Sequence, residues 1–304
     1  MIHCKELKKD FSTKEEMFKE LVKNETKIAE LKKATLKNTD SINIFGIKDN
    51  NSIKALSFVK DGFVYPIINT TNYFDSHGDV HFPNLWNKSL KDKSKKIFYV
   101  LEHELELDSV IAFPNDVNAF VKNVNWSDLG LSYDGQTQAL IFEIAKDKIR
   151  IDKVAELFQE QVSFENSVRM RYINVNLAIN STSSDYEKQY TLWKARIDQV
   201  ANKDVAIENG YMWCIDEASI EKEGSLVLFG SNDATPIIYQ KAEKSTSKCD
   251  NCGEDTEDFE AENGEIVCKK CGNKKKAEKS LSEIEAEKSL QQEQQLKELL
   301  NKFN

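Results

Sequence analysis

The chain has 304 residues, 40% hydrophobic and 31% charged, so it can bury a core and is neither collagen-like nor wholly disordered. Its 51 acidic and 42 basic residues give a net charge of −9, which argues against a protein that mainly coats nucleic acid. No apolar run approaches the roughly 20 residues that span a bilayer, and residues 1–5 lack the order of a signal peptide. We expect a soluble intracellular protein, with one medium-sized domain plus appendages and no membrane partner.

The first predicted element is a charged amphipathic helix near residues 13–34. Ser12 and Thr13 followed by Glu15 and Glu16 form a capping-box pattern. Apolar residues then recur at helical spacing: Phe18, Leu21, Val22, Ile28 and Leu31. Residues 1–38 are therefore predicted as an N-terminal helical segment.

Residues 39–240 are predicted as the main domain. Strand patterns occur at residues 42–47, 57–59, 63–69, 97–101, 118–124, 139–144, 168–179 and 211–215. Helical patterns occur at residues 148–161 and 186–201. Because no repeated strand-helix-strand rhythm occurs, we expect an α+β fold: a mostly antiparallel sheet or barrel core with flanking helices.

A polar stretch at residues 70–83 allows two interpretations. Its Asp75, His77, Asp79 and His81 have the side chains of a zinc or iron site. Alternatively, the two aspartates accept backbone N–H bonds in a tight turn around Gly78. The turn is the favoured interpretation.

Two residues further along could form a nucleophile and its base. His103 follows an apolar strand pattern, and Ser167 lies where a predicted helix runs into a strand. A serine becomes a nucleophile when a neutral imidazole takes its proton. The ordinary alternatives are a buried histidine and a serine that caps a turn. Ser163 is the second candidate nucleophile.

The acids between residues 211 and 236 could orient an imidazole. Glu223, Asp216 and Glu217 compete for that role, and the ordinary alternative is a set of surface acids beside a buried strand. Cys214 lies in the apolar run at residues 211–215 and is predicted as an inert core residue.

Four of the six cysteines lie together near the C-terminus. Cys249 and Cys252 form one CxxC pair, Cys268 and Cys271 the other, and fifteen residues separate the pairs. Two such pairs predict a structural Zn²⁺ site in a ribbon at residues 249–273. Disulfides fit less well without an export signal. A polar linker at 241–248 precedes the ribbon, and residues 274–304 are predicted as a terminal helix with an unidentified partner.

Taken in order, these patterns resemble the prohead maturation proteases of tailed bacteriophages, a family related to herpesvirus capsid assembly proteases. The resemblance covers about residues 40–240. The matching residues are Asp75-Ser76-His77-Gly78-Asp79, His103, Ser167-Val168-Arg169-Met170-Arg171, Glu223-Gly224-Ser225-Leu226-Val227 and Gly230-Ser231-Asn232. One departure is Arg169, because the family usually has glycine at the second position after the serine.

The resemblance implies a serine endopeptidase in which Ser167 attacks, His103 is the general base and Glu223 is the third member, with Asp216 and Glu217 as the next candidates. Backbone N–H groups of residues 216–224, helped by Arg169 or Arg171, would meet the oxyanion. The implied substrates are phage scaffold and major capsid protein precursors, with possible self-cleavage. The implied location is the assembling procapsid in the host cytoplasm.

Two other function classes compete. The first is a non-enzymatic scaffold or internal capsid protein, with a degenerate protease core and a zinc ribbon for interactions. The second is a zinc-ribbon protein that acts on DNA or transcription, which Lys269, Lys270 and lysines 274–276 favour. Nucleic acid is disfavoured as a partner, because the ribbon carries six acids that would repel phosphate: Asp250, Glu254, Asp255, Glu257, Asp258 and Glu260.

Overall fold

The computed structural model describes residues 1–36, 58–162, 164–228, 235 and 237–238, and the backbone of short strands between residues 247 and 276. The chain divides into two units, Met1–Lys241 and Ala242–Asn304. Several predictions lie outside the described residues: the strand at 42–47, Ser163, the Gly230–Asn232 motif and most of the terminal helix.

The N-terminal segment is a hairpin followed by two helices. Strands β1 (Ile2–Cys4) and β2 (Lys9–Phe11) pair antiparallel. Helices α1 (Lys14–Lys23) and α2 (Glu25–Ala34) replace the single predicted helix, with Asn24 between them. Thr13 is the N-cap, as the capping-box pattern predicts, and its Oγ1 accepts from Glu16 N at 3.2 Å. The Glu16 carboxylate accepts from Ser12 N at 3.1 Å, one residue before the N-cap.

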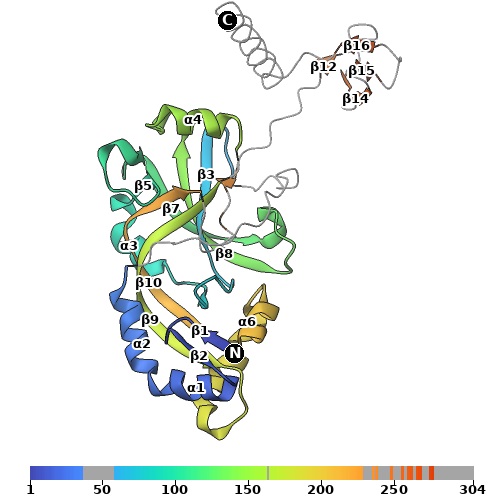
Figure 1. Ribbon diagram of the computed structural model, residues 1–304. Helices are drawn as coiled ribbons and strands as arrows, with labels where there is room; N and C mark the ends of the chain where they lie inside the picture. Colours follow the sequence, from blue (N-terminus) through green and yellow to red (C-terminus); the bar gives the residue numbers. More distant parts are fainter. Residues whose placement is uncertain are drawn as a thin grey trace, which may run out of the picture. The chain divides into compact units, whose positions relative to one another are not determined.

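The larger sheet is built around strand β10 (Tyr211–Val227). On one edge β10 pairs antiparallel with β9 (Glu165–Ile179), and the two strands run side by side in Figure 1. On the other edge β10 pairs in parallel with β4 (Asp79–His81) and then β5 (Phe98–Leu101), and β5 pairs with β6 (Val110–Ala112). One long strand therefore connects chain segments far apart in the sequence.

A second sheet has the order β11-β3-β8-β7, and all its pairings are antiparallel. Its strands are β3 (Phe63–Thr70), β7 (Val117–Asn125), β8 (Gln136–Ala145) and β11 (Ile237–Ile238). It packs closely on β10 at Gly224, where a Cβ atom would come within 2.7 Å of the Phe142 ring and 2.9 Å of Ile68. Glycine is needed there because the two sheets leave no room for a side chain.

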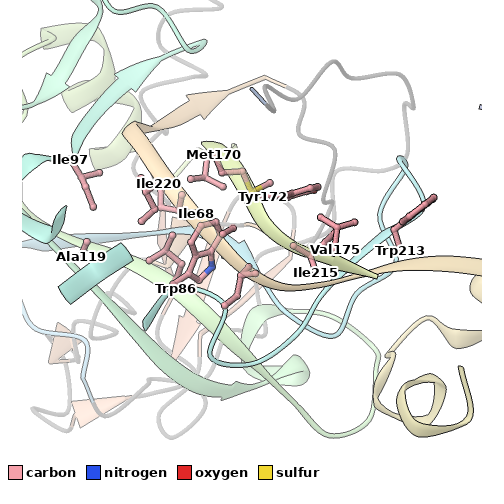
Figure 2. Packing of buried hydrophobic residues seen from close by; sticks show 14 of the residues in the cluster. Ile68, Trp86, Ile97, Ala119, Met170, Tyr172, Val175, Trp213, Ile215 and Ile220 are labelled. Carbon is pink, nitrogen blue, oxygen red and sulfur yellow. The ribbon is translucent and has the colours of Figure 1, made fainter. Parts of the chain in front are cut away.

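The core lies between these layers. Figure 2 shows buried side chains from both sheets and the segment between them in one cluster, including Ile68, Trp86, Met170 and Ile220. Helices α2 and α5 (Glu187–Arg196) contact β9, and α3 (Asn87–Lys93) contacts β10. The remaining α-helices of the described residues are α4 (Asp152–Gln159) and α6 (Lys203–Asn209). No helix among these residues is long and apolar enough to cross a membrane.

The α+β prediction with mostly antiparallel sheets is confirmed, and the barrel alternative is wrong. The described strands form separate open sheets that do not close on themselves. In the larger sheet, β10 pairs with β9 along one edge and with both β4 and β5 along the other. The described outer strands of this sheet do not pair with each other, so the sheet stays open.

The C-terminal unit contains a two-stranded sheet, β12 (Ser247–Lys248) with β13 (Asp255–Thr256). Its other sheet joins β14 (Phe259–Glu262), β15 (Glu265–Cys268) and β16 (Lys274–Lys276), all antiparallel. Residues 274–276 are thus a strand and do not begin the predicted helix. Cys249, Cys252 and Cys271 lie outside the described residues, and the zinc site stays a prediction.

Candidate active site

The strand register places three chain segments together at one end of the larger sheet. Ser167 on β9 lies opposite Ser225 on β10. On the other edge of β10, Ser225 lies opposite Val100 of β5, and His103 follows β5 by two residues. Because side chains alternate along a strand, Glu223 shares its face of β10 with Ser225. Pairing of distant strands therefore gathers Ser167, His103 and Glu223.

Their side chains form one hydrogen-bonded chain. His103 Nε2 lies 2.8 Å from Ser167 Oγ, and His103 Nδ1 lies 2.8 Å from Glu223 Oε1. In the neutral tautomer that donates Nδ1–H to the carboxylate, Nε2 is free of a proton and accepts the serine hydroxyl. The order is acid, imidazole, hydroxyl, which is the order that lets an imidazole take a serine proton.

The histidine sits on a tight left-handed bend. Glu102 has φ 45° and His103 has φ 62°, values that L-residues seldom adopt. Glu102 N donates to Leu226 O at 2.9 Å, and Glu104 N donates to Leu101 O at 2.8 Å. His103 N donates to Ser225 Oγ at 3.0 Å. Such a bend costs about 1–3 kcal/mol per residue and persists only when its surroundings hold it.

Glu223 is completely buried and fully engaged. Its Oε2 accepts from Ser225 Oγ at 2.9 Å, and its Oε1 accepts from Arg169 Nε at 2.9 Å as well as from His103. A buried carboxylate is tolerated when it has an ion-pair partner and hydrogen-bond donors. The arrangement fixes the acid beside the imidazole.

The residue before the nucleophile is anchored separately. Asn166 accepts from Tyr99 OH at 2.7 Å, and its amide donates to Thr235 O at 2.8 Å. Thr235 Oγ1 in turn donates to Asn166 O at 2.7 Å. Sequence reasoning missed this anchor. Thr235 carries no pattern that marks it, and only the run of motifs around Ser167 points toward Asn166.

The competing acids lie elsewhere. Asp216 pairs with Arg196 at 2.7 Å, and Glu217 pairs with Lys88 at 3.1 Å. The structure thus brings Glu223 to His103 and gives the other two acids different partners. The two arginines suggested for the oxyanion also have other contacts: Arg169 with Glu223 and the His103 carbonyl, and Arg171 with Ala34 O.

The Asp75 stretch forms the predicted turn. Asp75 Oδ1 accepts from His77 N at 2.8 Å and Asp79 N at 2.9 Å, and Gly78 has φ 74°. No group of histidines, cysteines and acids within the described part of the chain could hold a metal ion. The turn interpretation is confirmed, and the metal interpretation of these residues has no support.

Asp79 instead centres a buried polar cluster, which we call the Asp79 network. Its members are Lys32, Asn69, Asp79, His81 and Tyr172. Lys32 Nζ lies 2.5 Å from Asp79 Oδ1, Tyr172 OH donates to Asp79 Oδ2 at 2.9 Å, and His81 Nε2 lies 3.1 Å from Tyr172 OH. Sequence reasoning missed Lys32, whose helix lies far from Asp79 in the chain.

Burial and charge shift several pKa values here. Burial and the neighbouring Asp79 carboxylate raise the pKa of Asp75 to about 7. Burial alone would lower the pKa of Lys32, but Asp79 and Glu6 outweigh it, so the pKa is raised. Burial and the Asp79 charge raise the pKa of Tyr172 well above its ordinary value. Tyr172 therefore keeps its proton and acts as a donor to Asp79.

Cys214 is fully buried, as predicted for a core residue. Burial raises the pKa of its thiol, so the thiolate needed for chemistry is suppressed.

No family model, curated protein or solved structure matches the chain.

Proposed function

We propose that this protein is a serine endopeptidase with Ser167 as nucleophile, His103 as general base and Glu223 as the acid that orients the imidazole. The observation that carries the proposal is the position of the His103 ring, with one nitrogen 2.8 Å from Ser167 Oγ and the other 2.8 Å from Glu223. Three residues from separate segments meet in the order that the chemistry needs.

The reaction follows from that order. Ser167 Oγ attacks the peptide carbonyl carbon while His103 Nε2 takes the hydroxyl proton. The tetrahedral intermediate collapses when His103 returns the proton to the leaving amine, which leaves an acyl ester on Ser167. Water, deprotonated by His103, then cleaves the ester and regenerates the serine. Glu223 holds the tautomer and stabilises the transient imidazolium.

The substrate class comes from the motif resemblance to prohead maturation proteases. On this proposal the substrates are scaffold and major capsid protein precursors of a tailed phage, cleaved inside the assembling procapsid, with possible self-cleavage. The zinc ribbon, with Cys249, Cys252, Cys268 and Cys271 as ligands, has a structural role and takes no part in hydrolysis.

One observation favours a second candidate function. Ser167 exposes 2% of its surface and His103 exposes 8%, so little of the trio is open to solvent. A buried, well-bonded trio also suits a non-enzymatic scaffold or internal capsid protein that keeps a protease-like core for stability.

Co-expression with the neighbouring capsid and scaffold genes separates the two candidates. The peptidase proposal expects precursor fragments with the parent chain and none with Ser167→Ala, in equal amounts of folded protein. Lys88→Gln serves as a matched control, because Lys88 is an exposed residue of α3, a helix that contacts β10, and pairs with Glu217. Intact precursors with the parent chain would favour the scaffold function.

A further inference from the structure

Two side chains beside the trio share an unusual pattern of contacts. Arg169 donates through Nε to Glu223 Oε1 and through Nη2 to the backbone carbonyl of His103. Ser225 donates through its hydroxyl to Glu223 Oε2 and accepts from the backbone N–H of His103. Each residue thus bridges the acid's carboxylate and the histidine's main chain, one at its N–H and one at its C=O.

The histidine needs such support. His103 and Glu102 both have positive φ, and this conformation persists only when neighbouring contacts hold it. Without these contacts the bend could relax and carry the ring away from Ser167 or Glu223. An error of about 1 Å in such a geometry costs up to about 100-fold in rate.

Arg169 differs from Ser225 in carrying a charge. Among the described residues, the charged groups that contact His103 include Glu223 of β10 and Arg169 of β9. Glu102 and Glu104 flank His103 on its own loop, and Glu102 accepts from Leu228 N. The guanidinium lies on the same carboxylate oxygen that accepts from His103 Nδ1. It offsets part of the negative charge that would otherwise stabilise the imidazolium.

We propose that Arg169 and Ser225 are positioning residues that bridge the acid and the histidine backbone, and that Arg169 also neutralises part of the charge on the Glu223 carboxylate that holds the imidazole. The proposal rests on the proposed peptidase function. It separates a geometric role, common to both residues, from an electrostatic role that belongs to Arg169 alone.

The two roles predict different signatures. Arg169→Gln removes the cation beside the Glu223 carboxylate, so the acid limb of the pH profile should move upward, because the base must be neutral to act. Ser225→Ala removes no charge, so it should lower kcat about 10- to 100-fold and leave the limb in place. Arg169→Lys keeps the positive charge, so the acid limb should stay in place while kcat falls.

The experiment follows the ¹³C resonance of the His103 ring against pH in the full chain, alongside hydrolysis of a peptide substrate. The chain has four histidines, so His103→Asn identifies the resonance. Lys88→Gln is the control for loss of one positive charge near β10. The His103 titration is read without turnover, so it is independent of whether the protein is a peptidase.

Each result has a defined meaning. An Arg169→Gln titration equal to those of the parent and Lys88→Gln would overturn the electrostatic role. Parent-like kcat in Ser225→Ala and Arg169→Lys would overturn the positioning role, and Arg169→Lys also serves if Arg169→Gln does not fold. A parent chain that hydrolyses nothing, with the titration shift intact, would reject the peptidase function while the charge effect on His103 stands.

Discussion

Two regions of the larger sheet each contain a carboxylate, an imidazole and a hydroxyl group, hydrogen-bonded in different orders. In the trio, His103 lies between the carboxylate of Glu223 and the hydroxyl of Ser167. In the Asp79 network, the hydroxyl of Tyr172 lies between Asp79 and His81. Strands β9 and β10 pass through both regions, so the two regions differ in the order of the three groups and in the hydroxyl, which belongs to a serine in one and to a tyrosine in the other.

The order decides what each region can do. An imidazole between acid and hydroxyl has one nitrogen held as a donor and the other open as an acceptor, which is the arrangement of a general base. In the Asp79 network, the Tyr172 hydroxyl donates its proton directly to the Asp79 carboxylate. Burial and the charge of Asp79 raise the pKa of Tyr172, so the hydroxyl keeps its proton. The Asp79 network therefore stabilises the fold, whereas the trio is suited to general-base chemistry.

The regions are alike in how they neutralise a buried acid. Lys32 of α2 meets Asp79, and Arg169 of β9 meets Glu223. Lys32 ties the N-terminal helix to the sheet. Arg169 stays within the site, where its fork reaches both the acid and the histidine backbone.

The largest expected effect is on the trio. Ser167→Ala and His103→Ala should each lower hydrolysis about 10⁶-fold, and the double variant should be no worse, because both changes disable one proton-coupled attack. Urea unfolding should show a folded protein in each case. Near-parental hydrolysis by Ser167→Ala would mean that the nucleophile is misassigned, and Ser163 would be tested next.

Glu223→Gln should cost less, about 10⁴-fold in kcat, because an orienting acid does not itself react. Steady-state kinetics on a peptide substrate measures the loss. Asp216→Asn and Glu217→Gln are matched controls that alter acids of the same strand bound to Arg196 and Lys88. A larger loss in either control would move the third role away from Glu223.

Changes in the Asp79 network should lower the stability of the fold. Lys32→Met leaves the Asp79 carboxylate buried without its cation, which should lower the free energy of unfolding by about 3 kcal/mol. Urea denaturation measures this change, with exposed Lys23→Met as a control. A stability equal to the control's would contradict the structural role of the ion pair.

Asp75 should make stability depend on pH. Its pKa in the folded protein is raised to about 7, above the ordinary carboxyl value, so the folded state binds the proton more tightly. The contribution of Asp75 to the free energy of unfolding should be greatest below about pH 4 and should fall as the pH rises through about 7. Asp75→Asn keeps the turn's acceptor oxygen and should flatten this dependence in urea titrations, whereas an unchanged slope would assign it to another group.

Removal of the predicted Zn²⁺ should have the smallest effect on hydrolysis by the trio. The purified chain should bind one Zn²⁺ through Cys249, Cys252, Cys268 and Cys271, because two CxxC pairs suit a tetrahedral ion. Chelation should release zinc and leave hydrolysis of a small peptide unchanged. Metal analysis without zinc after purification under reducing conditions would reject the site, and lost hydrolysis would reject the separation of roles.

The sequence predicted much of the fold because the strands at 63–69, 118–124 and 139–144 carry clear apolar patterns. It underestimated β10, expected at 211–215, because the charged residues from Asp216 to Glu223 resemble a loop. It missed α3, whose surface is mostly lysine and polar groups. Strand pairing supports those charged positions, and no local pattern reports such pairing.

The site was predicted in part for the same reason. Ser167 and His103 lie at the ends of elements with clear sequence patterns. The choice among the three acids depends on which of their side chains lies on the face of β10 that carries His103. Irregularities in the β9–β10 register at Ile215–Glu217 and Ile220–Gly224 change the face that each residue occupies. Lys32 and Thr235 enter through tertiary contacts that have no sequence signal, and the motif that contains Ser225 does not show which groups Ser225 contacts.

The most direct test of the central claim is covalent labelling by a fluorophosphonate, which reacts with a serine only when a base activates it. Mass mapping of the labelled chain should place the probe on Ser167, and His103→Ala should remove it while Lys32→Met keeps it. A parent chain that stays unlabelled, or a label on Ser167 that persists in His103→Ala, would contradict the account.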